Sequence, residues 1–173
     1  ERLAKLTSAI TDFKSTEELL LGMLVIALLP AIGEELVFRG MIQHELWRST
    51  RNIHLAIWIS AGIFSAIHMQ FYGFIPRLLL GALFGYLYYW SGNLLIPIFS
   101  HFFNNAFAVI MVYLNQLEFT DINMEDGEAA PVQYVVIGLS LTLAFIYYIW
   151  KHYREFPPTK DEAHKDSINQ QAL

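Results

Sequence analysis

Long stretches of this chain carry no formally charged side chain, and this limits the folds that it can adopt. Residues 19–33, 52–76, 78–117 and 129–150 contain no Asp, Glu, Lys or Arg. A helix needs roughly 20 apolar residues to cross a bilayer core of about 30 Å. The chain is 55% hydrophobic and 16% charged, whereas ordinary soluble domains are about 25% charged. The pattern predicts an all-α, polytopic transmembrane helix bundle.

The uncharged runs predict about five spanning helices. We expect them at about Leu19–Gln43, between Arg51 and Arg77, and at about Ile75–Trp90, Leu94–Leu114 and Ala129–Trp150. The third and fourth are separated at Ser91-Gly92-Asn93, because the 40 uncharged residues after Arg77 exceed one crossing. Apolar residues at helical spacing predict an interfacial helix over residues 1–16. We expect one domain over 1–155, with a catalytic core over 19–114 and an extra helix over 129–150, and then a polar tail over 156–173.

The distribution of basic residues predicts an orientation. Arg48 and Arg51 follow the first helix, and Lys151 and Arg154 follow the last, whereas the acidic loop Glu118–Glu128 has no Lys or Arg. The first loop and the C-terminus are therefore expected in the cytoplasm and the acidic loop outside. No basic patch suggests a nucleic-acid partner, and a chain without cysteine has neither disulfides nor thiolate metal sites.

Two adjacent acids, Glu34 and Glu35, directly follow the first uncharged run. A charge at bilayer depth costs from about 2.5 kcal/mol upwards, so an intramembrane cluster is a functional-site hypothesis by default. On a helix, Glu35 and Arg39 share a face and can pair, whereas Glu34 is rotated by about 100°. This leaves Glu34 available as a general base. The simpler alternative is an Arg–Glu pair that pins helices together.

Two further polar clusters lie in the uncharged runs. Phe64-Ser-Ala-Ile-His68 places a histidine inside the second helix, and His101-Phe-Phe-Asn-Asn105 places two polar groups on one face of the fourth. Asn104 is expected to point elsewhere. Taken singly, each cluster is also explained by packing, as a hydrogen-bonded core histidine and as an interhelical polar clamp.

Taken together, the clusters predict a catalytic site, because Glu34, His68 and His101 come from three separate helices. Glu, His and His with an open position form a familiar zinc set. A Glu–His pair that activates water without a metal is equally compatible with the residues. His101 and Asn105 could then donate hydrogen bonds to an oxyanion. Both arrangements fit hydrolysis of an amide within the membrane.

The motifs Glu-Glu-x-x-x-Arg, Phe-x-x-x-His and His-x-x-x-Asn, each on its own hydrophobic helix, resemble those of the CPBP family. This family groups the type II CAAX prenyl proteases with bacteriocin-processing and Abi proteins. The resemblance covers about residues 19–114. It implies that Glu34 and His68 activate the attacking water and that His101 and Asn105 stabilise the oxyanion. It also implies that Glu35 and Arg39 organise the site.

The resemblance leaves the cofactor open, as either none or one divalent metal. Zinc is the candidate, and the label metalloprotease is often applied to the family. A bound metal would have Glu34, His68 and His101 as ligands. We favour metal-free catalysis, because His101 and Asn105 already have a use as an oxyanion site.

We therefore expect an intramembrane endopeptidase in a bacterial or archaeal cell membrane, acting on a peptide or protein near the bilayer surface. The alternative is a non-hydrolytic membrane immunity or peptide-binding protein on the same scaffold. A proton-relaying transporter is less favoured, because the chain has no internal repeat. The sequence leaves open whether the substrate is prenylated and which oligomeric state the protein adopts.

Overall fold

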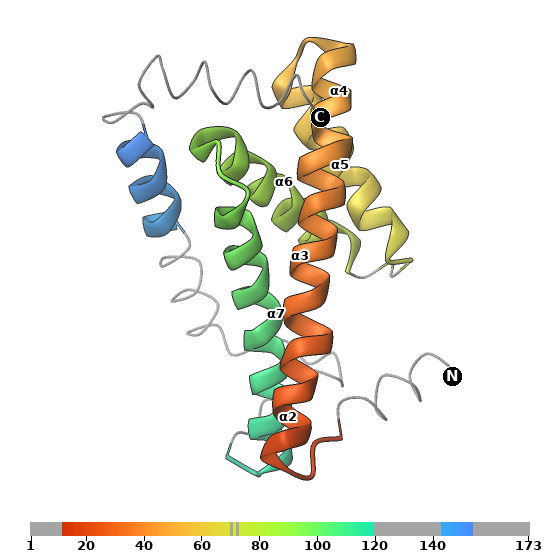
Figure 1. Cartoon of the computed structure of the whole chain (residues 1–173), viewed down its shortest axis with the longest axis vertical. Helices are drawn as coiled ribbons and strands as arrows, with labels where there is room; N and C mark the ends of the chain where they lie inside the picture. The colour runs from red at the N-terminus through yellow and green to blue at the C-terminus, as the bar shows by residue number, and fades with distance from the viewer. Residues whose placement is uncertain (1–11, 70, 72, 120–142, 154–173) are drawn as a thin grey trace.

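The computed structural model describes residues 12–69, 71, 73–119 and 143–153, and the regular elements of this part of the chain are all helices (Figure 1). In chain order they are α2 (Thr16–Gly22), η1 (Met23–Leu28), α3 (Leu29–Glu35), η2 (Leu36–Ile42), α4 (Gln43–Thr50), α5 (Ile53–Ile67), α6 (Phe74–Ser91) and α7 (Leu95–Gln116). Residues 143–153 form a further helix. The predicted all-helical class is confirmed.

The elements α2 to α4 form one continuous helix, Thr16–Thr50, which is longer than the predicted first span. It begins after Ser15, whose side chain accepts a hydrogen bond from Glu18 N. Two segments of this helix, η1 and η2, have π-helical turns. The first ends two residues before Pro30, which lacks an N–H and whose ring would clash with the carbonyl of Ile26 in a regular helix. The wider π turn lets the helix continue through the proline.

The next helix, α5, is shorter than the sequence predicted. Asn52 caps its start, with its side chain accepting from Leu55 N at 3.2 Å, and the helix ends at Ile67. At 1.5 Å per residue its length is about 22 Å, less than a bilayer core of about 30 Å. The sequence placed His68 inside this helix, which is wrong. His68 is the C-cap, and the next residue, Met69, has a left-handed φ of 51°.

The helices α6 and α7 agree with their predicted bounds to within two residues. They are joined at the predicted turn, where Gly92 adopts a φ of 62° that favours glycine. The helix α7 returns antiparallel to the long helix, so its C-terminal end lies beside α2 (Figure 1). There Phe13 N donates to Gln116 Oε1 at 3.1 Å.

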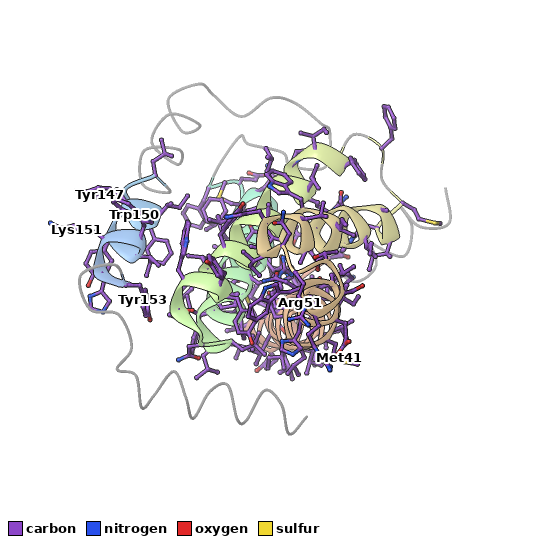
Figure 2. The ribbon with its side chains drawn as sticks, turned by 90° about the horizontal axis from the view of Figure 1, so that it is seen from above. Met41, Arg51, Tyr147, Trp150, Lys151 and Tyr153 are labelled. Atoms are coloured by element: carbon purple, nitrogen blue, oxygen red, sulfur yellow. The ribbon has the colours of Figure 1, made fainter. Side chains whose placement is uncertain are left out.

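The helix over residues 143–153 packs against α6 through Ile149, which contacts Phe84 and Leu87. Viewed along the bundle, the side chains of Tyr147 and Lys151 lie on one side of the molecule and those of Met41 and Arg51 on the other (Figure 2). The helix coincides with the end of the predicted fifth span. The rest of that span, the predicted interfacial helix up to residue 11 and the polar tail lie outside the described residues.

The outer surface of the bundle is rich in large apolar side chains, and ionisable groups are buried among the apolar residues of its interior. Large apolar side chains such as Leu20, Met41 and Phe103 are 64%, 64% and 67% exposed, whereas Glu35 and Arg39 are buried. Within the described residues, Thr16–Thr50 and Leu95–Gln116 are long and apolar enough to cross a bilayer. An apolar exterior around buried ionisable groups is the arrangement expected of a helical membrane bundle.

Close packing of α6 depends on two glycines four residues apart. A Cβ on Gly81 would lie 3.2 Å from Ala61 Cβ, and one on Gly85 would lie 2.9 Å from Ile57 Cγ2. The missing side chains also expose backbone carbonyls to the long helix. Gly81 O accepts from Arg39 Nη2 at 2.6 Å, and Gly85 O accepts from Gln43 Nε2 at 3.3 Å.

Candidate active site

The four residues predicted to be catalytic line one cavity of about 390 Å³ between the helices. They are Glu34 on α3, His68 at the end of α5, and His101 and Asn105 on α7. The rest of the lining is mostly apolar and consists of Ile26, Pro30, Phe64, Arg77, Leu80, Phe84, Asn104, Ala108, Val109 and Val112. Ligand pockets in proteins usually enclose about 300–1,000 Å³, so the cavity can hold a short peptide segment.

Glu35 contacts both Arg39 and His101. Its Oε1 accepts from Arg39 Nη1 at 2.8 Å, as helical spacing predicted, and lies 2.8 Å from His101 Nδ1. All three side chains are buried, with exposed fractions of 0% for Glu35, 1% for Arg39 and 4% for His101. A buried ion pair of this kind is favourable only when its remaining hydrogen-bond donors and acceptors also have partners. Arg39 meets this need by donating also to Gly81 O, whereas Oε2 of Glu35 has no hydrogen-bond partner among the described residues.

The contact with Glu35 places a proton on Nδ1 of His101. An ionised carboxylate only accepts hydrogen bonds, so His101 Nδ1 is the donor. The other ring nitrogen, Nε2, lies 3.7 Å from Oε2 of Glu34. Glu34 is 29% exposed, so the two acids have different environments. Glu35 thus orients His101, and Glu34 faces the cavity.

Phe64 contacts both histidines of the site. Its ring lies edge-on to both histidines, with centroid distances of 5.0 Å to His68 and 5.9 Å to His101. The guanidinium carbon of Arg39 lies 5.2 Å from the same ring. Phe84 stacks on His101 at 5.1 Å from the other side. The phenylalanine of the Phe-x-x-x-His motif therefore fixes the two imidazoles relative to each other.

His68 has a defined tautomer of its own. Its Nδ1 lies 2.8 Å from Phe64 O, and a carbonyl can only accept, so Nδ1 donates. In the neutral ring Nε2 then keeps its lone pair. His68 is therefore able to accept a hydrogen bond from water in the cavity.

Asn105 is oriented by its neighbour. Asn104 Nδ2 donates to Asn105 Oδ1 at 3.3 Å, which leaves the Nδ2 group of Asn105 as the donating end of its amide. The sequence prediction that Asn104 points elsewhere is wrong, because Asn104 lines the same cavity. The two residues are adjacent on α7, and the cavity extends around enough of the helix to meet both.

Arg77 is a cavity residue that the sequence reasoning missed. It belongs to the second turn of α6 and its Nη1 is buried. The signal was present, because Arg77 is the one formal charge between Arg51 and Glu118. The sequence prediction uses Arg77 only as a helix boundary, although the cost of a charge at bilayer depth applies to this cation as it does to Glu34.

The described residues do not assemble a complete metal-binding set. No group of three His, Cys, Asp or Glu side chains among them is placed to hold a metal ion. Glu34 and His101 face one another at 3.7 Å, and His68 joins them as part of the cavity wall. The ligand set Glu34, His68 and His101 therefore stays a prediction, and no step below depends on a metal.

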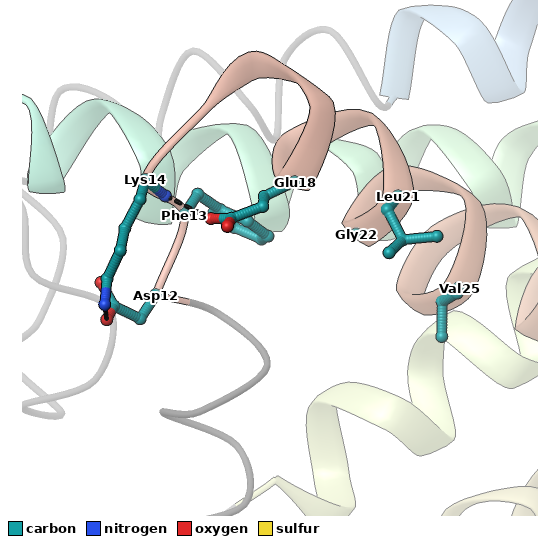
Figure 3. Close-up of a pocket in the computed structure, with 7 residues that line it drawn as sticks. All are labelled: Asp12, Phe13, Lys14, Glu18, Leu21, Gly22 and Val25. Carbon is teal, nitrogen blue, oxygen red and sulfur yellow. Dashed lines mark hydrogen bonds and ion pairs between the residues drawn. The ribbon is translucent and has the colours of Figure 1, made fainter.

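A second cavity of about 390 Å³ lies at the start of the long helix (Figure 3). It is lined by Asp12, Phe13, Lys14, Glu18, Leu21, Gly22 and Val25. Its charged side chains have partners within the lining: Lys14 Nζ lies 3.4 Å from Asp12 Oδ2, and Glu18 Oε2 accepts from the backbone N of Lys14 at 2.6 Å. The predicted site residues are not part of its lining, so the cavity around Glu34 is the candidate active site.

The fold and this cavity define a helical membrane protein with a carboxylate–imidazole centre between its helices. The family model described as type II CAAX prenyl endopeptidase Rce1-like matches residues 16–107, more than half of the chain. The chain belongs to this family, which confirms the resemblance that its motifs indicated.

Three curated bacterial proteins are similar to the chain. The uncharacterised protein YpbD of Bacillus subtilis (strain 168) is 29% identical over 107 residues, which are 60% of this chain and 49% of YpbD. YdiL of the same strain, named as a proposed membrane peptidase, is 31% identical over 135 residues, 78% of this chain and 52% of YdiL. The membrane-embedded CAAX protease MroQ of Staphylococcus aureus (strain USA300) is 32% identical over 96 residues, 52% of this chain and 38% of MroQ.

The chain thus spans about half the length of these relatives or less. No solved structure matches it significantly. The comparisons identify the family of membrane peptidases, and the roles of individual residues are inferred from geometry and chemistry.

Proposed function

We propose that the protein is a multi-pass bacterial intramembrane endopeptidase that hydrolyses a peptide bond near the membrane surface with water activated by Glu34 and His68. One observation carries the proposal. Glu34, His68, His101 and Asn105, which come from three separate helices, line one cavity in a mostly apolar bundle. Membership of a peptidase family and the similarity to MroQ support the same reaction class.

In the proposed first step Glu34 is the general base. Its carboxylate takes a proton from water while the water oxygen attacks the peptide carbonyl carbon. His68 Nε2 accepts a hydrogen bond from the second water proton, because its Nδ1 is committed to Phe64 O. Positioning and proton transfer of this kind typically contribute about 10²–10⁴-fold to a rate.

In the next steps His101 and Asn105 stabilise the tetrahedral oxyanion. Asn105 donates through Nδ2, the end of its amide that does not contact Asn104. His101 donates through Nε2 in its doubly protonated form, in which both ring nitrogens face carboxylate oxygens at 2.8 and 3.7 Å. Collapse of the intermediate breaks the C–N bond, and the proton held by Glu34 passes to the leaving amine.

The experiment is cleavage of a peptide library by the purified protein in detergent, with metal content measured on the same preparation. Glu34→Gln keeps the volume of the side chain and removes the base, so we expect cleavage to fall by at least about 10²-fold. Glu34→Ala is expected to behave in the same way. The matched control is Glu45→Gln, an exposed acid further along the same helix, which is expected to cleave as the parent does.

If Glu34→Gln cleaves as well as the parent, the assignment of the base is wrong. If the parent binds library peptides but cleaves none of them, the protein is a binding module on this scaffold and the enzymatic proposal fails. Loss of cleavage on chelation, restored by zinc, would support Glu34, His68 and His101 as ligands of a catalytic metal ion.

A further inference from the structure

The cavity contains a charged side chain that the proposed mechanism does not use. Arg77 is the one Lys or Arg among the described residues that line it, and it shares the lining with Glu34, His68 and His101. A guanidinium at the wall of a mostly apolar cavity inside a membrane bundle is costly to maintain. Packing alone would be met by an apolar residue at this position.

The backbone is shaped to receive the head of this side chain. A Cβ added to Gly73, at the start of α6, would lie 2.6 Å from Arg77 Nη1, 3.0 Å from Cζ and 3.2 Å from Nη2. Gly73 has a φ of −88°, which any residue can adopt. The guanidinium therefore occupies the space that a side chain at position 73 would take, and a Cβ there would displace it.

We propose that Arg77 is a specificity-determining residue that binds a carboxylate of the peptide substrate beside the reaction centre. This inference rests on the proposed function in assuming that the cavity accepts a peptide. A guanidinium presents a planar fork of donors that matches a carboxylate in two parallel hydrogen bonds. The pair is strong in a poorly hydrated cavity, where neither group is well solvated by water.

The size of the cavity limits where that carboxylate lies. Because one cavity of about 390 Å³ contains both Arg77 and the four proposed catalytic residues, the bound charge lies within a few residues of the scissile bond. The carboxylate could be the free C-terminus of the peptide or an acidic side chain. Both present the same chemistry to Arg77, and the remaining lining favours apolar side chains beside it.

The test measures binding, so that it does not depend on cleavage. Three acetylated tripeptides serve as probes. N-acetyl-Val-Ile-Leu has a free C-terminal carboxylate, its C-terminal amide is neutral, and N-acetyl-Val-Ile-Glu amide has a carboxylate on its side chain. Their affinities for the purified full chain in detergent are measured by titration. We expect at least one carboxylate probe to bind about 10- to 100-fold more tightly than the neutral amide. The tighter of the two identifies the source of the charge.

Two substitutions connect this preference to Arg77. Arg77→Gln is expected to remove the preference for the carboxylate while leaving affinity for the neutral amide unchanged, and Arg77→Lys is expected to restore part of it. Gly73→Ala keeps Arg77 but displaces its guanidinium, so the preference should fall there too. Gly62→Ala is the matched control, because a Cβ at Gly62 meets nothing within 4 Å.

Equal binding of all three probes by the parent would overturn the proposal. So would an equal loss of affinity for charged and neutral probes in Arg77→Gln, which would indicate a structural role. A parent that binds the carboxylate selectively but cleaves no peptide would leave this inference standing and contradict the proposed reaction instead.

Discussion

Glu35 contacts two buried side chains, and the two contacts have different consequences. The side chain pairs with Arg39 at 2.8 Å and also accepts from His101 Nδ1 at 2.8 Å. The first contact concerns stability, because a buried charge needs a partner. The second concerns catalysis in the proposed mechanism, because it orients His101. A single substitution of Glu35 removes both contacts together.

A double substitution separates them. Removing one member of a buried ion pair costs about 3–5 kcal/mol, whereas replacing both by apolar residues of similar size is often neutral. We expect Glu35→Leu to lower the thermal midpoint in detergent and Glu35→Leu/Arg39→Met to recover most of the loss. Peptide cleavage should stay at least about tenfold below the parent in both variants, because His101 has lost the group that orients it.

The control for this prediction is the exposed pair of Glu45 and Arg48, which lie 3.0 Å apart. Exposed pairs contribute about 0–1 kcal/mol, so Glu45→Gln/Arg48→Gln should change neither quantity appreciably. Recovery of both stability and cleavage in the Glu35→Leu/Arg39→Met variant would mean that Glu35 serves stability alone.

The sequence predicted part of this arrangement. Helical spacing correctly paired Glu35 with Arg39, because their separation of four residues depends only on one helix. It did not predict the contact between Glu35 and His101, which are 66 residues apart. That contact depends on how α7 packs against the long helix. The same limit applies to Arg77, whose place in the cavity follows from the packing of α6.

At the scale of elements, the length of α5 positions His68. The helix is about 22 Å long and ends at Ile67, and its C-cap residue, His68, lines the cavity together with Glu34 and His101. The sequence could not predict this end, because the residues from Ile67 to Pro76 carry neither a charge nor a strong breaker before Gly73. A helix that crossed the full bilayer would carry the residues after Ile67 beyond this depth.

The packing of α6 against α5 gives an element-scale prediction. A Cβ at Gly85 would lie 2.8 Å from Gln43 Oε1 and 2.9 Å from Ile57 Cγ2, and Ile57 is fully buried. Overpacking of this kind costs about 1–3 kcal/mol, so Gly85→Ala should lower the thermal midpoint in detergent. Gly62→Ala, in open space on α5, should instead stabilise by about 0.5–1 kcal/mol through helix propensity.

An unchanged or raised midpoint for Gly85→Ala would mean that α6 can move away from the long helix at little cost. The hydrogen bond from Gln43 Nε2 to Gly85 O makes this unfavourable, since the same displacement would break it. Cleavage is expected to fall with the midpoint, because Gly81 and Arg39 lie one turn away on the same interface.

At the scale of the whole molecule, the C-terminal ends of Thr16–Thr50 and Leu95–Gln116 lie at opposite ends of the bundle. Figure 1 shows α4 at one end of the long axis, and the last turn of α7 beside α2 at the other. Basic residues gather near α4, whereas acidic residues follow α7. The positive-inside rule therefore predicts that α4 ends in the cytoplasm and that α7 ends outside.

Because the chain has no cysteine, single cysteines can test this orientation without background labelling. Ser49→Cys lies on α4, and Phe119→Cys follows α7 at a residue that is 79% exposed. With a membrane-impermeant maleimide, Phe119→Cys should label in intact cells and Ser49→Cys only after permeabilisation. Ala31→Cys, at a fully buried position, should label in neither case.

Labelling of both exposed sites in intact cells would contradict a bundle that crosses the membrane between them. The reverse pattern would keep the crossing and invert the orientation, which would place the acidic segment after α7 in the cytoplasm.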